Sequence, residues 1–393
     1  MNKSILNIEI QEFLNINIDS DITSVLLKGT HFKGVQTKEL VEQIEAKKRC
    51  KIKLSTWFNT PNIFYPNKLN IEQTSSETAA EYKSQLIEGD SIIDLTGGFG
   101  VDSFYYSKQF ETVTYCEINY SLSKIVAHNF NQLQIDNVKI NNTDGITFLK
   151  KSLKQYDWIY LDPSRRHDSK GKVFFLKDCL PNVPNNMEIL FNHSKNIMVK
   201  TSPLLDISVG LNELKYVKTI HIIAINNEVK ELLWVLENKY KNEIAVKTVN
   251  INKDTQEHFS FKLSSEAETG VNYSIPFTYL YEPNAAILKS GAFKTISNKL
   301  KLFKLHQHSH IYTSKYLINF PGRCFKIDKI LPYNKKDFKR ESIIKANITT
   351  RNFPETVKQI REKLKIKDGG NIYLFFTTNI KNKHIVLVCE KLS

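Results

Sequence analysis

Short apolar runs alternate with longer amphipathic stretches between residues 91 and 237. This alternation is typical of a parallel sheet with helices on both faces, so it predicts a Rossmann-like α/β domain. An Asn226-Asn227 pair separates the last two runs and predicts a tight turn, which makes these two strands an antiparallel hairpin at one edge of the sheet. The seven predicted strands are SIIDL, TVTYCEI, NVKINN, WIYLD, NIMVKT, TIHIIAI and ELLWVLE.

The segments on either side of this domain have other patterns. Residues 1–70 have mostly helical spacing, with TKELVEQIEAKKR capped by Thr37, and SSETAAEYKSQL predicts a further helix capped by Ser75 or Ser76. A polar stretch over 250–268 predicts a domain boundary. Beyond it, short strands and the helix PETVKQIREKL indicate small α+β modules. We expect a helical region over 1–70, the α/β domain over 71–250, and one or two small modules within 270–320 and 321–393.

Length and composition predict an ordered protein of more than one domain. A chain of 393 residues is too long for one core, and 41% hydrophobic with 24% charged residues is ordinary for globular domains. No apolar run approaches the ~20 residues of a membrane helix, and MNKSILNIEI has no signal-peptide core, so we expect no membrane association. The five cysteines are scattered and odd in number, which predicts buried free thiols in a reducing compartment and hence a cytoplasmic protein.

The net charge of +14 is concentrated at the C-terminal end of the chain. Residues 283–393 carry 23 Lys and Arg against 7 Asp and Glu, whereas residues 1–282 carry the other 32 of 55 basic and 34 of 41 acidic residues. This asymmetry favours a polyanion as partner, because Lys and Arg gain affinity by releasing counterions from phosphates. We therefore expect this part of the chain to bind nucleic acid; the alternative is a lysine-rich surface that only confers solubility.

The motif DLTGGFG ends the first predicted strand and leads into a helix. Glycines there let the backbone approach a ligand, and the helix N-terminus offers free N–H groups. Dinucleotide enzymes share such loops, but an acid at Asp94 would repel their pyrophosphate and suits the cationic amino group of S-adenosylmethionine. The loop therefore predicts an S-adenosylmethionine site, for which the candidate residues are Asp94, Thr96, Gly97, Gly98 and Gly100.

Two more acids follow at the ends of the next two predicted strands. Glu117, about 20 residues further on, is placed to accept hydrogen bonds from both ribose hydroxyls, and Asp144 to accept one from the adenine amino group. Either acid alone is more often a helix cap or a turn residue. Together with Asp94 they form a series along the carboxyl edge of the sheet, where ligands of open α/β folds bind.

The fourth predicted strand ends in DPSRR. An Asp-Pro at this place is similar to the (D/N)PP(Y/F) motif of methyltransferases that act on exocyclic amines. Asp162 and the following backbone carbonyl can accept both N–H protons of a planar amine, and Pro163 restricts φ so that the carbonyl is well placed. We predict that Asp162, Pro163 and Ser164 are catalytic residues of an in-line methyl transfer that depends mainly on positioning. A simple strand-ending turn is the alternative.

The sequence departs from the amine motif after Pro163. Ser164 replaces the second proline, and Arg165 stands where an aromatic ring would stack on a base. An Arg plane can stack on a base or pair with a phosphate, although a structural ion pair is equally consistent. After the fifth predicted strand, KTSPLLDI should border the substrate pocket, unless Pro203 and Asp206 only start the next helix. The substrate-binding candidates are Arg165, Arg166, Lys200 and Ser202, with Asp206 as a further candidate.

Two other features carry less weight. HQHSH would place His306, His308 and His310 on one face of a strand, but no cysteine or carboxylate lies nearby in the sequence, so we predict no metal site. Cys179 is a conceivable nucleophile for pyrimidine methylation, but it lies outside the strand-four motif in an apolar context. That context favours a packed thiol.

Together these motifs resemble a bacterial family of class I methyltransferases with a THUMP-like C-terminal domain. The resemblance implies the class I methyltransferase sheet, a small ferredoxin-like module over about 279–320 and a THUMP-like domain over about 321–393. The family is related to the RNA cap guanine-N2 methyltransferases, so action on RNA is implied too, and THUMP domains proper bind RNA. The matching stretches, which cover most of residues 70–393 in order, are EQTSSETAAEYK, DLTGGFGVDS, YLDPSRR, VKTSPLLDI, NNEVKELLWVL, YLYEPNAAILKSGAF, FPGRCFKI and RNFPETVKQIREKLKIKDGG.

The expected function is therefore S-adenosylmethionine-dependent methylation of an exocyclic nitrogen of a base in tRNA or rRNA, with the basic C-terminal modules docking the RNA. Two alternatives stay open at this point. One is an RNA-binding protein with a vestigial cofactor site, and the other is a methyltransferase that acts on a small molecule or a protein.

Overall fold

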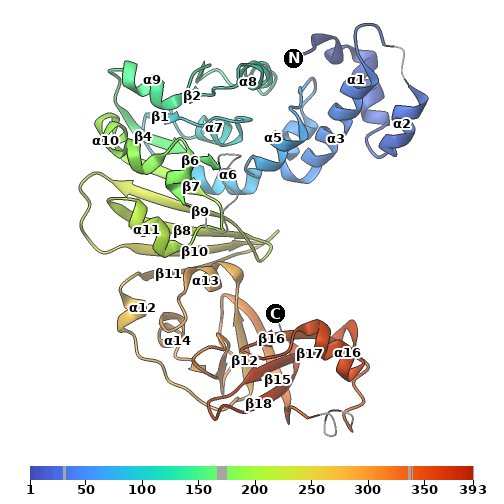
Figure 1. Ribbon diagram of the computed structural model, residues 1–393, viewed down its shortest axis with the longest axis vertical. Coiled ribbons are helices and arrows are strands. Elements are labelled where there is room, and N and C mark those ends of the chain that lie inside the picture. Colours follow the sequence, from blue (N-terminus) through green and yellow to red (C-terminus); the bar gives the residue numbers. More distant parts are fainter. Residues whose placement is uncertain (30–31, 166–174, 335–337, 339, 393) are drawn as a thin grey trace. The chain divides into compact units, whose positions relative to one another are not determined.

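The computed structural model describes the chain except for residues 30–31, 166–174, 335–337, 339 and 393. The described residues form two compact units (Figure 1). The first comprises Met1–Val217 and Trp234–Tyr240, and the second comprises Lys218–Leu233 and Lys241–Ser393. These units divide the chain within β8 (Val217–Ile225) and within β9 (Glu228–Glu237), so they are not the predicted domains, whose boundaries stay a prediction.

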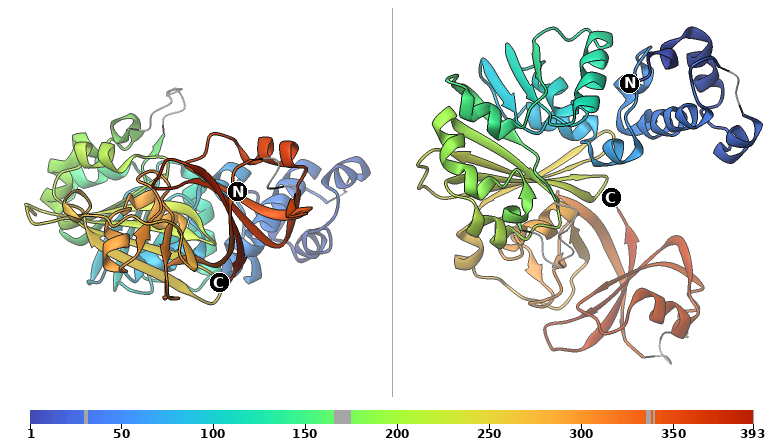
Figure 2. Two further views of the ribbon diagram at one scale, coloured as in Figure 1. Left: turned by 90° about the horizontal axis from the view of Figure 1, so that it is seen from below. Right: turned by 45° about the horizontal axis from the view of Figure 1, so that its top comes forward.

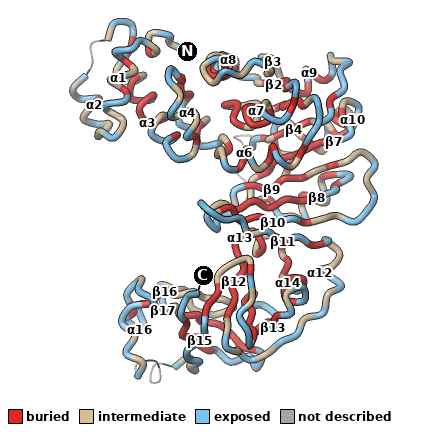
Figure 3. The backbone as a smooth tube through the Cα atoms, turned by 180° about the vertical axis from the view of Figure 1, so that it is seen from behind, coloured by how far each residue is buried: buried red, intermediate tan, exposed pale blue. Residues whose placement is uncertain are grey.

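Parallel strands form the sheet of the first unit: β1 (Ser91–Asp94), β2 (Thr112–Cys116), β3 (Val138–Asn141), β4 (Tyr156–Leu161) and β7 (Ser194–Thr201). β1 pairs with β2 and β4, β2 with β3, and β4 with β7, so all their carboxyl ends lie at one edge. β1 is buried from Ile92 to Asp94 and β7 from Ile197 to Thr201 (Figure 3 shows β7), as expected of strands covered on both faces. The helices that follow strands are α7 (Val101–Tyr106), α8 (Tyr120–Gln132), α9 (Gly145–Lys151), α10 (Val183–His193) and α11 (Ile207–Glu213).

The complete sheet also contains β8 (Val217–Ile225), β10 (Ala245–Ile251) and β11 (Gln256–Lys262). Its strand order is β11-β10-β8-β9-β7-β4-β1-β2-β3. All seven predicted strands are present, and the Rossmann-like fold is confirmed. The expected position of the β8–β9 hairpin at a sheet edge is wrong, because β10 pairs in parallel with β8 and β11 pairs antiparallel with β10.

The polar stretch over 250–268, which we interpreted as a domain boundary, contains strand β11. Phe259 and Phe261 are buried there, while Ser260 between them is exposed. This alternation is the two-residue period of a strand with one solvated face. The polar composition was therefore misleading, because it came from the solvated face of a strand and not from a linker.

Short helices precede the sheet, as the spacing predicts: η1 (Lys3–Leu6), α1 (Ile8–Ile16), α2 (Ile22–Lys28), α3 (Thr37–Lys53), α4 (Ser55–Asn59), α5 (Lys68–Gln73) and α6 (Glu77–Ser84). One apolar cluster joins them to α7 and α8, with the Trp57 ring 4.8 Å from that of Phe104. Ser76 caps α6 as predicted. Thr37 is not a cap, because Gln36 forms a capping box with Glu39 and Thr37 is the first helical residue.

The second unit contains a further sheet with the strand order β13-β14-β12-β15-β18-β17-β16. Its long strands are strongly twisted (Figure 2). Successive residues of β18 pack alternately into two apolar clusters, because Leu387 belongs to one and Val386 and Val388 to the other. The strands are β12 (Tyr279–Pro283), β13 (Phe303–Lys304), β14 (Tyr312–Ser314), β15 (Gly322–Pro332), β16 (Lys345–Arg351), β17 (Lys367–Thr378) and β18 (His384–Lys391). The helices are α12 (Ser265–Glu268), α13 (Ala285–Ser290), α14 (Thr295–Lys299) and α16 (Val357–Leu364).

Candidate active site

The glycines of DLTGGFG shape the loop after β1. A Cβ on Gly97 would lie 2.0 Å from the Tyr115 ring, and Gly100 starts α7 with a φ of +80°. Gly98, with a φ of +54°, donates its N–H to Glu117 Oε2 (2.9 Å). A Cβ on Gly98 would meet no atom nearer than 3.8 Å, so this part of the loop has room for a ligand.

Asp94 lies beneath this loop, and its side chain is 1% exposed. Its Oδ1 accepts a hydrogen bond from the Thr96 N–H (3.0 Å) and its Oδ2 accepts one from the Ser103 hydroxyl (2.7 Å). Burial raises the pKa of Asp94 to about 7, with a smaller contribution from the charges of Asp102 and Asp162. Because both oxygens are engaged within the protein, Asp94 holds the loop in shape. Its direct contact with a cofactor's amino group stays a prediction.

Glu117 follows β2 directly and is half-buried. Its second oxygen, Oε1, accepts a hydrogen bond from the Asn119 N–H (2.7 Å). Burial raises its pKa, and the backbone N–H groups that it accepts from oppose this shift. The next residue, Ile118, is 74% exposed and adds apolar surface beside the acid, which the sequence reasoning missed. The only sequence signal would have been an apolar residue directly after a strand-end acid.

Asp144 is further from its strand than the sequence indicated. β3 ends at Asn141, and Asp144 caps α9 by accepting a hydrogen bond from the Thr147 N–H (2.8 Å). Its side chain is half-buried. The structure thus shows the helix cap that was one interpretation of this residue, and its contact with adenine stays a prediction.

Asp162 connects the cofactor loop to the end of β4. Its N–H donates to the Thr96 hydroxyl (2.6 Å), and its carboxylate forms an ion pair with Lys200. The parallel register explains this pair, because Leu161 of β4 lies opposite Val199 of β7 and the next residues therefore emerge side by side. Burial raises the pKa of Asp162, and Lys200 opposes that shift. The sequence had placed both residues in the site but had not paired them.

The residues after Asp162 form a small ribbon. Pro163 is buried, and Ser164 is exposed. β5 (Ser164–Arg165) pairs antiparallel with β6 (Cys179–Leu180), which follows the 3₁₀ turn η2 (Leu176–Asp178). Only the backbone of Arg165 is described, and Arg166 lies outside the described residues. Their predicted contacts with the substrate therefore stay predictions.

All five cysteines are buried and free of disulfides, as the sequence predicts. Cys179 lies opposite Arg165 in the ribbon and is completely buried. Its sulfur lies 3.5 Å from the Phe175 carbonyl oxygen. These surroundings are those of a packed thiol.

The segment after β7 contributes turn and cap interactions. The Ser202 hydroxyl accepts a hydrogen bond from the Leu204 N–H (3.2 Å). Asp206 caps α11 and accepts from the Ser208 N–H (2.8 Å), so the structure shows it as a helix start. Of the candidates in this segment, only Lys200 is joined to Asp162 by a described contact.

A buried ion network, which the sequence reasoning missed, lies behind the Asp162–Lys200 pair. Lys83 of α6 is 0% exposed and forms an ion pair with Asp102 of α7 (2.8 Å). It also donates to the Ser75 hydroxyl (2.7 Å), while Ser75 and the Tyr160 hydroxyl both donate to Asp102 Oδ2 (2.9 Å each). Two positive charges, Lys83 and Lys200, outweigh burial and lower the pKa of Asp102. The sequence signals were a lysine in the apolar face of a short helix, and the position of Lys83 and Asp102 in two stretches that carry the family resemblance.

The histidines of HQHSH do not form the strand that we considered. His306 bonds to Asn352 (2.9 Å), and His310 stacks on Phe293 (3.6 Å). No group of three His, Cys, Asp or Glu residues that could hold a metal ion occurs in the described part of the chain.

Within the same described residues, no helix is long and apolar enough to cross a membrane.

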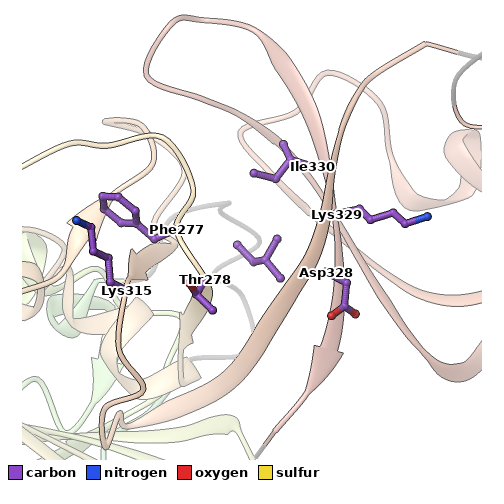
Figure 4. A pocket seen from close by; sticks show the side chains of 7 residues that line it. Phe277, Thr278, Lys315, Asp328, Lys329 and Ile330 are labelled. Atoms are coloured by element: carbon purple, nitrogen blue, oxygen red, sulfur yellow. The ribbon is translucent and has the colours of Figure 1, made fainter.

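The second unit has an open hollow of about 610 Å³ (Figure 4). Phe277 and Thr278 lie on one side of it and Ile330 on the other. Lys315 also lines it, with its ammonium 5.5 Å from the centre of the Phe277 ring. None of the strand-end acids lines this hollow, so it is separate from the candidate active site.

Comparison with known proteins extends the likeness over the whole chain. A solved structure described as "putative methyltransferase from Porphyromonas gingivalis W83" is 30% identical, covers 100% of both chains and has a TM-score of 0.90. Two family models match the C-terminal part: a ferredoxin-like domain over residues 279–321 and a THUMP domain-like model over residues 322–391. No curated protein matches the sequence.

Two of the more distant solved structures match less than half of the chain. An rRNA methylase from Streptococcus thermophilus is 12% identical, covers 42% of this chain and 95% of its own, and has a TM-score of 0.31. TrmK of M. capricolum, in complex with S-adenosyl-homocysteine, is 14% identical, covers 42% and 70%, and has a TM-score of 0.33. At these values we draw no functional conclusion from either likeness.

Proposed function

The chain belongs to the family of class I methyltransferases with a THUMP-like C-terminal domain, and we propose that it transfers a methyl group from S-adenosylmethionine to an exocyclic nitrogen of a base in tRNA or rRNA. The observation that carries the proposal is the hydrogen bond from the Asp162 N–H to the Thr96 hydroxyl (2.6 Å). This hydrogen bond joins Asp162, the proposed amine-binding acid, to the predicted cofactor loop at one edge of the sheet. The buried free thiols are consistent with a cytoplasmic enzyme.

The residues at this edge fit S-adenosylmethionine. Gly98 has room for a ligand at its Cα, and Glu117 beside it has carboxylate oxygens that can accept from ribose hydroxyls. Ile118 can pack on the adenine ring, and Asp144 can accept from the adenine amino group. When bound, S-adenosylmethionine supplies a methyl group on a cationic sulfur. Asp102 and Asp162 balance the charges of Lys83 and Lys200, and Asp94, whose pKa is about 7, adds a partial negative charge near neutral pH, which suits a cationic ligand.

Asp162 would hold the amine that receives the methyl group. Its carboxylate accepts a hydrogen bond from the amine N–H, which turns the nitrogen lone pair toward the methyl carbon. The N–C bond forms as the S–C bond breaks, and the bonding electron pair stays on sulfur. The nitrogen then loses a proton, for which Asp162 is the nearest base. Neither step needs a covalent enzyme intermediate.

A lysine patch in the second unit supports RNA as the substrate. Lys345 and Lys367 are register partners in the parallel β16–β17 ladder, and both are exposed. Like charges placed opposite one another destabilise a sheet slightly. Lys358 and Lys365 of the neighbouring helix segment are exposed as well, and none of the four has an ion pair in the described residues. Such a patch favours a phosphate backbone, which releases counterions when it binds.

The two alternatives make different predictions. An RNA-binding protein with a vestigial site would not bind S-adenosylmethionine in calorimetry, although the acids that we assign to the cofactor are all present. A methyltransferase for small molecules or proteins would keep its activity when the lysine patch is neutralised. Deleting the C-terminal modules is a poorer test, because the deletion would also remove contacts to the large sheet. Asn284 of that region, for example, donates a hydrogen bond to Glu257 of β11 (2.9 Å).

The most direct test compares modified nucleosides in RNA from a deletion strain and its parent by mass spectrometry. We expect one methylated nucleoside to disappear, and the purified protein to restore it in vitro with S-adenosylmethionine. The identity of the lost nucleoside would give the base and the atom. An unchanged nucleoside profile, together with no transfer to RNA from the deletion strain, would overturn the proposed function.

Substitution of Asp162 tests its proposed role. Asp162→Ala should lower the methylation rate by about 10²–10⁴-fold, the usual range for a group that handles a proton in the transition state. Binding of S-adenosylmethionine, measured by calorimetry, should stay within several-fold. Asp136→Ala is a matched control, because Asp136 is an exposed acid of the same unit without a described ion pair, and it should leave the rate unchanged. Normal turnover of Asp162→Ala would exclude this role.

A further inference from the structure

The two carboxylate oxygens of Asp162 have different surroundings. Oδ2 forms the ion pair with Lys200, whereas Oδ1 makes no hydrogen bond to any residue that the structure describes. The Asp162 side chain is 31% exposed, and that of Lys200 is 10% exposed. Oδ2 is therefore bound by Lys200, and Oδ1 is available to a substrate.

Lys200 itself lies in the field of the buried ion network. It contributes to lowering the pKa of Asp102, and both Asp102 and Lys83 influence the pKa of Asp162. The four charges therefore alternate in sign, from Lys83 through Asp102 and Lys200 to Asp162. Asp102 is kept in place by hydrogen bonds from Ser75 and Tyr160 and by the ion pair with Lys83, so the far end of this series is rigid.

We propose that Lys200 is a positioning residue that occupies Oδ2 of Asp162 and so presents Oδ1 to the amine, and that the buried Lys83–Asp102 pair sets the electrostatic potential at both. The inference rests on the proposed function, because it assumes that Asp162 binds the amine. It assigns roles to Lys83 of α6 and Asp102 of α7, which were not among the predicted site residues. It also changes the role of Lys200 from contact with the substrate to control of the acid that contacts it.

The physical reason is that a half-buried carboxylate must stay ionised to accept from an amine. Burial raises the pKa of Asp162 and Lys200 opposes this, while Asp102 raises and Lys83 lowers the pKa. Asp94 on β1 also interacts with Asp162. Removing a neighbouring positive charge should therefore move the acid limb of the pH–rate profile to higher pH, and removing a neighbouring negative charge should move it to lower pH.

The test measures kcat and KM from pH 5.5 to pH 9.5 for the full-length protein, with RNA from the deletion strain and radiolabelled S-adenosylmethionine. Lys200→Met should move the acid limb to higher pH; a shift of one pKa unit would lower kcat about tenfold at pH values below the limb, with recovery at high pH. Lys200→Arg should keep most of the wild-type profile. KM for S-adenosylmethionine should change little in both variants.

Asp102→Asn gives an independent sign test, since it removes a negative charge behind Lys200. It should move the acid limb to lower pH, opposite to Lys200→Met. A purely structural role would lower kcat equally at all pH values in both variants, and that outcome would overturn the inference, as would an unshifted profile in both. Intrinsic fluorescence shows whether each variant is folded, because Trp57, Trp158 and Trp234 all belong to the first unit. If one variant does not fold, the sign of the shift in the other decides. If the wild-type protein transfers no methyl group, the proposed function has failed and not this inference.

Discussion

The candidate active site and the lysine patch use the same residue type in opposite ways. Lys83 and Lys200 are buried and each has a carboxylate partner, whereas Lys345 and Lys367 are exposed and face one another. Buried charges interact strongly and over short distances, so paired ones hold a fixed geometry. Exposed charges are screened individually but add up to a field that attracts a polyanion. The difference separates the part of the molecule to which we assign the chemistry from the part to which we assign RNA docking.

The largest effect on stability should come from breaking the buried pair. Lys83→Met leaves Asp102 charged and without its cation, which should lower the free energy of unfolding by about 3–5 kcal/mol. Urea unfolding followed by tryptophan fluorescence reports on the first unit alone, because all three tryptophans lie there. The exposed Lys48–Asp19 pair is the matched control, since Lys48→Met should cost about 0–1 kcal/mol. Equal costs would contradict the distinction between buried and exposed charge.

The double variant Lys83→Met, Asp102→Asn refines this measurement. Removing both charges should recover a large part of the lost stability, because the cost of the single substitution is mainly an uncompensated buried charge. If the double variant is no more stable than Lys83→Met, the loss comes from packing around the lysine stem instead.

An effect of similar size is expected from the pH dependence of Asp94. Burial raises its pKa from 3.8 to about 7, so the folded state holds a proton that the unfolded state releases. The stabilising contribution is therefore fully present below pH 3.8 and is lost as the pH rises to about 7. Asp94→Asn should become more stable relative to wild type between pH 4 and pH 7, by about 1.4 kcal/mol for each pKa unit, and level off above. A stability difference that does not vary with pH would show that Asp94 titrates normally.

The smallest expected effect per residue is on RNA affinity, and it comes from substitutions in the lysine patch. Neutralising Lys345 and Lys367 with glutamine should weaken RNA binding and lower the slope of log affinity against log salt by about one for each phosphate that the protein no longer neutralises. The same two-charge change at Lys3 and Lys38, exposed lysines of the first unit, is the control and should leave the slope unchanged. Fluorescence anisotropy with tRNA at several salt concentrations measures both. Equal slopes in the two variants would remove the patch from the docking surface.

The sequence predicted the features that depend on local pattern. The glycines of DLTGGFG, the acids Glu117 and Asp144, and the Asp-Pro of β4 follow from a strand, a turn and a helix start, each encoded within a few residues. The seven strands were predictable for the same reason, because their apolar runs are short and bounded. The error at 250–268 came from judging β11 by its composition, when the alternation of Phe259 and Phe261 with polar residues carried the signal.

What the sequence by itself determined is therefore the identity of the loop, the acids and the basic C-terminal region. The tertiary structure decided which charges meet. Lys200 reaches Asp162 because β4 and β7 are in register, and Lys83 reaches Asp102 because α6 and α7 pack together. It also decided that the β8–β9 hairpin lies inside the sheet. These contacts join residues that are distant in the chain, and the partners of a buried charge depend on strand register and packing, which no local pattern contains.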